Sequence, residues 1–190
     1  MAVLPIYEFP EAVLRRKAAP VTAIDDTLQR LIDDMIQTMY DAPGIGLAAP
    51  QIGVSLRLFV VDVTSGRDAN ALMTFINPEI IKAEGRIQED EGCLSLPGVY
   101  GPTPRATHVV LRGMNRQGEV VEVEGEGLLA RAFQHEMDHL QGMLFFNRMG
   151  PASRDIVIRK FKRAQRQRRL CPPELRCECS QLRILGRFDK

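Results

Sequence analysis

The clearest hydrophobic repeat in the chain covers residues 25–40. Its apolar side chains recur three and four positions apart, which is the spacing of one face of an α-helix: Leu28, Leu31, Ile32, Met35, Ile36 and Met39. Thr22 or Asp25 can cap the start of this helix, and Pro43 and Gly44 end it. We therefore predict an N-terminal amphipathic helix whose apolar face covers the core.

Short segments of strand-like composition follow this helix. They predict strands at residues 56–63, 73–76, 80–84, 107–113 and 119–124. The sequence MNRQG separates the last two strands and is typical of a hairpin turn. The earlier sequence GIGLAAPQIG is apolar but broken by glycine and proline, so we expect a shaped loop at residues 44–53.

Two more helices are expected after most of the strands. Helical patterns cover residues 126–141, where Gly142 ends the pattern, and residues 153–169. The helices bracket the strands instead of alternating with them, which favours an α+β fold over an α/β fold. We expect antiparallel β-sheets packed around the central helix at 126–141, with the amphipathic helix and a C-terminal helix completing the fold.

The length of 190 residues suits one domain with a substantial core. We assign residues 1–170 to this domain, because residues 171–190 lose the hydrophobic period and change in composition. The C-terminal segment contains Cys171, Cys177 and Cys179, whose C-x5-C-x-C spacing differs from the C-x2-C spacing of common structural zinc sites. We expect a disordered tail without a metal site.

Charge and composition exclude several classes of protein. The chain has 25 Lys and Arg against 24 Asp and Glu, so its net charge of +1 predicts binding neither to specific DNA nor to an anionic membrane. The N-terminus lacks the basic start and apolar run of a signal peptide, and no segment approaches a membrane span. The cysteines are poorly distributed for disulfides. We expect a soluble cytoplasmic protein.

The sequence FQHEMDH at residues 133–139 contains the pattern H-E-x-x-H. On a helix His135 and His139 share a face, because four residues advance about 400° at 3.6 residues per turn. Glu136 lies one position further round, where it can act as a general base on a water molecule, as in H-E-x-x-H hydrolases. The five-residue pattern also occurs by coincidence on solvated helices, and it supplies only two ligands.

The third ligand is not evident from spacing. His108 lies far upstream in a predicted strand, and the extended zincin pattern meets Phe145 where its third histidine should stand, which excludes that class. Three acids lie downstream: Asp155, Glu174 and Glu178. The upstream candidate is Cys93 in EGCLSLPG, although a lone cysteine is often a small buried apolar residue.

Three motifs together closely resemble the peptide deformylase family, whose members remove the N-terminal formyl group from new bacterial polypeptides. They are GIGLAAPQ at residues 44–51, EGCLS at 91–95 and QHEMDHLQG at 134–142. The similarity also includes the opening IYEFPEAVLRRKAAPV and the first helix, so it covers most of residues 1–165 but not the tail. A match to three motifs in order is far more specific than H-E-x-x-H alone.

The resemblance implies a metal site made by Cys93, His135 and His139, with water as the fourth ligand. A thiolate suits a softer transition metal. By resemblance the divalent ion is Fe²⁺, with Zn²⁺, Ni²⁺ or Co²⁺ as alternatives.

The resemblance also implies a mechanism of hydrolysis. Glu136 takes a proton from the attacking water and passes it to the leaving amine. The side-chain amide of Gln51 and the backbone N–H of Leu94 stabilise the oxyanion, and one such donor is typically worth about 10²–10³ in rate. The substrates are formylmethionyl nascent peptides, and the products are formate and a free α-amino group.

Candidate substrate contacts lie in the first and third motifs. Gly44 and Gly46 let the main chain approach the substrate, although a tight apolar turn explains them as well. Leu128 and Ala132 share the helix face of the histidines and, with Ile45, can form an apolar pocket for the methionine side chain. Packing of Leu128 in the core is an equally good interpretation.

Charged residues near the motifs add further expectations. By resemblance Glu91 pairs with Arg105 beside the site and belongs to the substrate-binding region. The aliphatic stem of Arg131 is expected at the rim of the pocket, with its charge outside. Tyr100 stands where some family members carry an arginine near the substrate backbone, so this contact differs here.

Two other functions compete with this interpretation. A general zinc metallopeptidase would use the same helix but has no use for EGCLS. A ribosome- or RNA-binding module would use RKFKRAQRQRR at residues 159–169, which is otherwise a solvated helix face. This basic helix, beginning at Arg159, is also compatible with catalysis, because it could dock the enzyme on ribosomal RNA by phosphate contacts.

Overall fold

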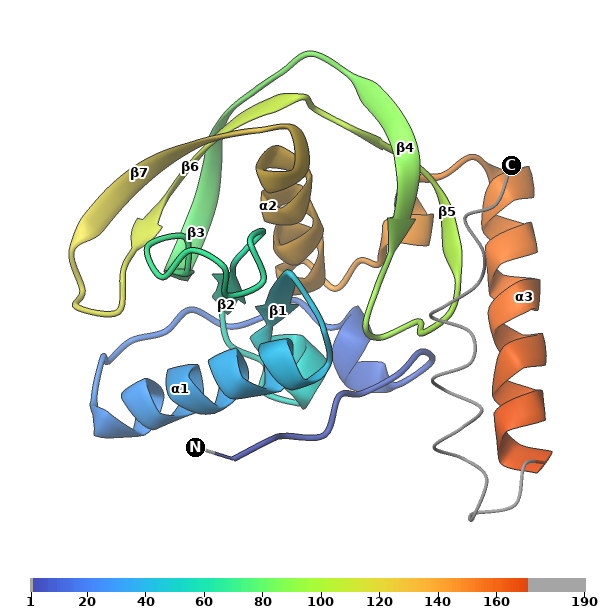
Figure 1. Ribbon diagram of the computed structural model, residues 1–190, viewed down its shortest axis with the longest axis horizontal. Coiled ribbons are helices and arrows are strands. Elements are labelled where there is room, and N and C mark those ends of the chain that lie inside the picture. Colours follow the sequence, from blue (N-terminus) through green and yellow to red (C-terminus); the bar gives the residue numbers. More distant parts are fainter. Residues whose placement is uncertain (1, 171–190) are drawn as a thin grey trace.

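The computed structural model describes residues 2–170, and the side chains up to residue 168. Its larger sheet is antiparallel and has the strand order β1-β2-β3-β6-β7, while β4 and β5 form a separate two-stranded antiparallel sheet. The strands are β1 (Gly46–Ala48), β2 (Leu58–Val61), β3 (Met73–Glu84), β4 (Ile87–Gly92), β5 (Tyr100–Arg105), β6 (His108–Met114) and β7 (Val120–Glu126). The helix α2 (Gly127–Leu140) lies between the two sheets (Figure 1). The predicted α+β architecture around a central helix is confirmed.

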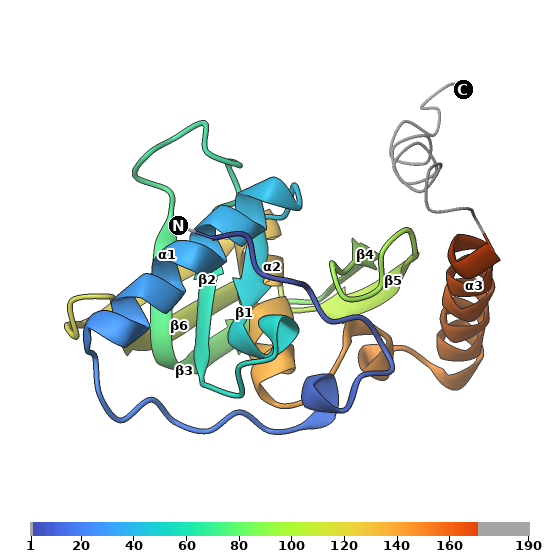
Figure 2. The ribbon, with the colours of Figure 1, turned by 90° about the horizontal axis from the view of Figure 1, so that it is seen from below.

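The N-terminal amphipathic helix is present as α1 (Asp26–Asp41). Asp25 is its N-cap, because the Asp25 carboxylate accepts a hydrogen bond of 2.9 Å from the N–H of Leu28. The apolar face of α1 packs on β1 and β2, and its residues Ile32, Met35 and Met39 are fully buried. Figure 2 shows α1 across one side of the larger sheet.

The segment after α1 has more regular structure than the loop we expected at residues 44–53. It contains the short strand β1 and the 3-10 helix η2 (Ala49–Ile52), and the predicted strand at 56–63 is confined to β2. All residues of β1 and η2 are buried. Glycine and proline shape this segment but do not prevent pairing of β1 with β2.

Two strands predicted at 73–76 and 80–84 are a single bent strand, β3. The pairing of β3 with β6 shifts in register between Ile76 and Glu79. Asn77 at this irregularity has a positive φ of 51°, and its side-chain amide exchanges two hydrogen bonds of 2.8 Å with the backbone of Val21. A β-bulge therefore bends one strand where the sequence indicated a break. The hairpin between β6 and β7 closes at the predicted MNRQG turn, where the N–H of Gly118 bonds to the carbonyl of Asn115.

The sheet of β4 and β5 was not predicted. Its sequences, IQEDEG and YGPTPR, are polar or rich in proline, and Pro102 and Pro104 lack the N–H that a strand donates. A two-stranded sheet tolerates them, because each strand has only one neighbour. The inward side chains of β5 are Thr103 and Arg105, so this small sheet buries a polar face beside α2.

The C-terminal part of the described chain is η3 (Phe145–Arg148) and α3 (Pro151–Leu170). Val157 and Phe161 of α3 are buried in a third apolar cluster with η3 and the turn after β4. At the other end, η1 (Ala12–Arg15) buries Leu14. No helix within residues 2–170 is long and apolar enough to cross a lipid bilayer. The tail expected at 171–190, with its three cysteines, lies outside the described residues.

Candidate metal centre

Two helical residues and one loop residue converge beside α2. His135 and His139 lie one turn apart on α2. The helix ends just before Gly142, which has a positive φ of 72°. Cys93 follows the last residue of β4. Its Sγ lies 3.3 Å from Nε2 of His139, and this nitrogen lies 3.2 Å from Nε2 of His135. The ligand atoms of Cys93, His135 and His139 all lie within 4.8 Å of one another. Among the described residues, this is the group that could hold a metal ion.

The donor set fits a tetrahedral transition-metal ion. Ligands about 2.0–2.3 Å from a tetrahedral ion lie roughly 3.3–3.7 Å apart, close to the distances of 3.3 Å and 3.2 Å from Nε2 of His139 to Cys93 and His135. Both histidines present Nε2. Burial lowers the pKa of His139 well below its ordinary value, whereas Cys93 and Glu91 raise the pKa of His135 against the effect of burial. The Nδ1 atom of His139 is buried and has no hydrogen-bond partner among the described residues.

Glu136 is a buried carboxylate without a partner. Its side chain is 3% exposed, and Oε2 accepts no hydrogen bond from any described residue. Burial raises the pKa of Glu136 to about 7, with Glu91 and Asp138 adding to the effect and His135 and Arg105 opposing it. A buried, unsatisfied carboxylate beside three metal-binding side chains is typical of a catalytic site.

Gln51 directs its amide toward Cys93. Its Oε1 accepts a hydrogen bond of 2.8 Å from the N–H of Ala48, which fixes the orientation of the amide. Its Nε2 then donates to Ser95 Oγ at 3.3 Å and lies 3.7 Å from Cys93 Sγ. Ser95 was not a predicted site residue, although it belongs to EGCLS. Leu94 follows Cys93 directly, and its N–H donates to no backbone carbonyl among the described residues. The Gln51 amide and the Leu94 N–H are therefore two donors next to the metal ligands.

The glycines of the first motif lie against this group because there is no room for a side chain. A Cβ on Gly46 would overlap Oε1 of Glu136 and would lie 2.9 Å from its Cδ. A Cβ on Gly44 would lie 2.9 Å from Cδ1 of Leu94. β1 therefore passes directly alongside the carboxylate of α2, which explains the glycines by close approach.

Glu91 is held between Arg105 and His135. Arg105 donates from Nε to Oε2 at 2.9 Å and from Nη2 to Oε1 at 2.6 Å, while Nδ1 of His135 lies 2.5 Å from Oε1. Burial acts to raise the pKa of Glu91, but these partners hold it at about 2. The predicted pairing of Glu91 with Arg105 is present. Because both oxygens are occupied, the geometry favours a positioning role for Glu91 over contact with a substrate.

The candidate apolar pocket is divided between core and surface. Ala132 is 5% exposed and belongs to the main core cluster, against which Ile45 also packs. Leu128 is 47% exposed at the start of α2. Arg131 forms an ion pair with Glu89 and donates to the carbonyl of Asp90 at 2.9 Å, so it ties α2 to β4 instead of extending freely to solvent.

Other residues proposed for the site lie elsewhere. Tyr100 is 65% exposed on β5, and its ring lies over Gly92. Asp155 lies on α3 and is not part of the metal-binding group, while Glu174 and Glu178 lie outside the described residues. His108 pairs with Glu124 on the larger sheet.

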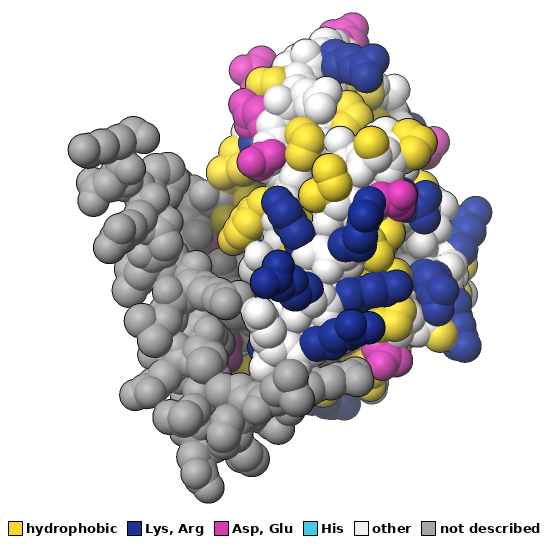
Figure 3. Space-filling view, turned by 90° about the vertical axis from the view of Figure 1, so that its right-hand side faces the viewer, with side chains coloured by type: hydrophobic (Ala, Val, Ile, Leu, Met, Phe, Trp, Pro, Cys, Tyr) yellow, Lys and Arg dark blue, Asp and Glu magenta, His cyan; other side chains and the backbone are white. Residues whose placement is uncertain are grey.

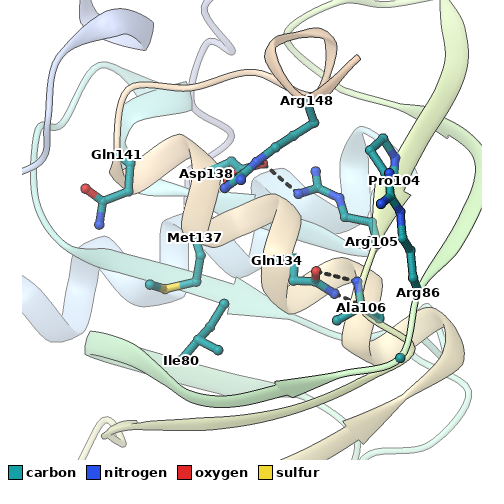
Figure 4. Close-up of a pocket in the computed structure, with 11 residues that line it drawn as sticks. Ile80, Arg86, Pro104, Arg105, Ala106, Gln134, Met137, Asp138, Gln141 and Arg148 are labelled. Carbon is teal, nitrogen blue, oxygen red and sulfur yellow. Dashed lines mark hydrogen bonds and ion pairs between the residues drawn. The ribbon is translucent and has the colours of Figure 1, made fainter. Parts of the chain in front are cut away.

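The opposite side of α2 borders a second feature, an open cavity of about 370 Å³ (Figure 4). Asp138 and Arg148 lie on its wall, joined by an ion pair of 2.6 Å. Neither residue was predicted to have a role. The signal for Asp138 was a carboxylate within a mostly apolar helix, but nothing near it in the sequence indicated its partners.

Comparisons with known proteins agree with this geometry. The Polypeptide deformylase family profile matches residues 3–155. The peptide deformylase of Acidobacterium capsulatum is 49% identical over 166 residues, covering 87% of this chain and 98% of that protein. That of Syntrophobacter fumaroxidans is 50% identical over 163 residues, covering 86% and 96% respectively.

Solved structures give the same result. A peptide deformylase from Legionella pneumophila superposes with a TM-score of 0.85 at 44% identity, covering 90% of this chain and all of that one. One from Synechococcus elongatus, in complex with actinonin, has a TM-score of 0.80 at 40% identity and covers 84% of this chain and 88% of that one. Since the family match includes all three segments that meet at the metal-binding group, this chain belongs to the peptide deformylase family.

Proposed function

We propose that this protein removes the N-terminal formyl group from formylmethionyl peptides by metal-dependent hydrolysis, releasing formate and a free α-amino group. The observation that carries the proposal is the convergence of Cys93, His135 and His139 beside Glu136, whose Oε2 has no hydrogen-bond partner among the described residues. Family membership supplies the substrate class. A general metallopeptidase is less well supported, because it leaves Cys93 unexplained.

Cys93, His135 and His139 hold the ion in this proposal. One thiolate and two imidazoles suit a transition metal softer than Mg²⁺ or Ca²⁺, and we propose Fe²⁺, with Zn²⁺, Ni²⁺ or Co²⁺ able to replace it. When bound, the divalent ion supplies a Lewis acid that polarises the formyl carbonyl and makes water more acidic.

Glu136 moves the protons of the reaction. Its carboxylate takes one proton from the water whose oxygen attacks the formyl carbon. It then delivers this proton to the nitrogen of the leaving amine, so the C–N bond breaks and formate departs. No described residue donates a hydrogen bond to Oε2, which supports this role, because a carboxylate already saturated by arginines would be a poor base.

Gln51 and Leu94 stabilise the negative oxygen that forms during the attack. Gln51 is 1% exposed, and the bond from Ala48 to its Oε1 leaves the Nε2 amide pointing at the site. The N–H of Leu94 is the second donor. Such preorganised donors stabilise a transition state without reorganisation, and removal of one typically lowers kcat by about 10²–10³.

The substrate is placed by the first motif and the start of α2. Gly44, Ile45 and Gly46 carry the main chain past the reacting carbon, and Leu128 with Ala132 forms an apolar wall for the methionine side chain. Burial of Ala132 and exposure of Leu128 suit a pocket that begins at the surface and ends at the core. Glu91 contributes by holding the ring of His135.

The surface of α3 supports a second, separate proposal, docking on the ribosome from a cytoplasmic location. Figure 3 shows lysine and arginine side chains gathered on this side of the molecule. Within residues 159–168 of α3, five basic residues are exposed: Arg159, Lys160, Lys162, Arg163 and Arg166. Phosphate contacts by such a helix would weaken with salt. We assign residues 1–170 to the catalytic domain, and this helix is its C-terminal element.

The decisive experiment measures formate release from formyl-Met-Ala-Ser by protein purified anaerobically with Fe²⁺. We expect activity in the native protein and loss of activity in Glu136→Ala and Cys93→Ala. The matched control is Glu124→Ala on β7, whose side chain is 69% exposed. Absence of formate release by the native, iron-loaded protein would overturn the proposal.

Ribosome cosedimentation that survives replacement of the five basic residues by alanine would overturn the docking proposal.

A further inference from the structure

A chain of alternating charges begins at the metal ligand His135 and leads through the protein to the far side of α2. His135 contacts Glu91, Glu91 binds Arg105, and Nη1 of Arg105 donates to Oδ2 of Asp138 at 2.6 Å. Asp138 in turn accepts from Arg148, at 2.6 Å from Nη2 to Oδ1 and 3.2 Å from Nε to both oxygens. Figure 4 shows Asp138 next to Arg105 and Arg148, beside the cavity.

The charged side chains in this series of ion pairs are buried, so each one needs an opposite charge beside it. The side chains of Glu91, Arg105 and Asp138 are only 8%, 2% and 3% exposed, so each charge depends on its neighbours for compensation. Glu91, Arg105 and Asp138 together carry one excess negative charge. The guanidinium of Arg148, which is 46% exposed at the end of the chain, neutralises it.

Arg105 has one guanidinium to divide between two carboxylates. Nε and Nη2 serve Glu91, while Nη1 serves Asp138. If Arg148 were absent, Asp138 would have Arg105 as its remaining cation and would draw this guanidinium away from Glu91. Glu91 would then hold His135 less firmly, because the same oxygen, Oε1, binds both Arg105 and His135.

We propose that Asp138 and Arg148 are positioning residues for the metal ligand His135, acting through Arg105 and Glu91. Groups that orient a ligating histidine typically change metal affinity or activity 10–100-fold when they are replaced. The effect of Arg148 is transmitted through three intervening side chains and should lie near the lower end of this range. This inference rests on the metal site of the proposed function, but not on the identity of the substrate.

The test measures Co²⁺ binding to the full-length protein, by competition with a chelator and by the visible absorption of the bound ion. Arg148→Ala should weaken Co²⁺ affinity roughly tenfold and shift the absorption bands, because the ring of His135 is less well oriented. Arg148→Lys, which restores the charge, should recover most of the affinity. The matched control is Arg112→Ala, which removes a similarly exposed arginine paired with Glu122 on the larger sheet.

The outcomes separate this inference from the proposed function. If the native protein binds Co²⁺ and Arg148→Ala matches Arg112→Ala in affinity and spectrum, Arg148 acts only on the stability of the fold and the inference is wrong. If the native protein binds no Co²⁺, the metal site itself is wrong. Should Arg148→Ala fail to fold, Arg148→Gln, which keeps a donor without the charge, decides by the same comparison.

Discussion

Two acids on α2 show how differently a fold can treat a buried carboxylate. Glu136 and Asp138 are two positions apart and are 3% and 2% exposed. Asp138 faces the β4 and β5 side and accepts hydrogen bonds from two arginines. Glu136 lies with the metal-binding group, and its Oε2 has no partner among the described residues. Burial is therefore the same in both, and only the partners differ.

This difference separates a structural carboxylate from a reactive one. A buried charge with good partners is stable but is not free to exchange a proton, whereas one without partners destabilises the fold and is available for chemistry. Consistent with this, burial raises the pKa of Glu136 to about 7. Each substitution below tests one side of the comparison.

The largest effect should follow Glu136→Gln, which removes the base but keeps the shape of the side chain. We expect kcat for formate release to fall about 10²–10⁴-fold, the usual contribution of general acid–base catalysis. The melting temperature should remain unchanged or rise, because an unpartnered buried carboxylate is lost. A marked fall in melting temperature would show that Glu136 stabilises the fold as Asp138 does. Glu124→Gln on β7 is the surface control.

The second effect should follow Asp138→Ala, which leaves Arg105 buried with one counter-charge. Breaking a buried ion pair in this way costs about 3–5 kcal/mol of stability. Urea denaturation of the native and variant proteins measures the difference. A loss below about 1 kcal/mol, typical of exposed pairs, would contradict the role we assign to this carboxylate.

A smaller effect is expected for Gly46→Ala, which moves Glu136 without altering it. The added Cβ would overlap Oε1, so the carboxylate must shift. A displacement of this kind can lower the rate by about 10²-fold. Steady-state kinetics should show the loss in kcat, with metal content unchanged. Gly150→Ala is the matched control, because nothing lies within 4 Å of a Cβ there, and an equal loss in both variants would reject the explanation.

The smallest effect concerns a third carboxylate, Asp62, which resembles Asp138 in being well satisfied. Tyr40 donates to Oδ2 of Asp62 at 2.7 Å, and Thr64 and Gly66 donate as well. Tyr40→Phe removes one donor and should cost about 1 kcal/mol of stability at pH 7.

The same substitution should change the response to alkaline pH. Burial, with the hydrogen bond to Asp62, raises the pKa of Tyr40 to about 12. The stability that Tyr40 contributes is therefore fully present below its pKa of about 10 in the unfolded state, and this stability is lost as pH rises from about 10 to about 12. Denaturation curves across this range should decline more steeply for the native protein than for Tyr40→Phe. Parallel curves would contradict the assignment.

Most of the fold followed from local patterns, and the exceptions have physical causes. The periodicity of α1, the MNRQG hairpin and the extent of α2 were predicted correctly, and Asp25 was one of the two caps predicted for α1, since each feature depends on residues near one another in sequence. The strand β3 was predicted as two strands, because its bulge at Asn77 is stabilised by hydrogen bonds to Val21, which lies 56 residues away in sequence. β4 and β5 were missed because their residues are polar or proline.

By itself the sequence determined that His135 and His139 share one face with Glu136 beside them, because the geometry of a helix depends only on spacing. Its three motifs also indicated the family. Only the tertiary structure placed Cys93 within 3.3 Å of His139, connected His135 to Arg148 through ion pairs, and left Oε2 of Glu136 without a hydrogen-bond partner in the described part of the protein. Such contacts depend on how two sheets pack against a helix. The pairs Cys93–His139 and Glu91–His135 join residues more than 40 positions apart, which carry no local signal of that packing.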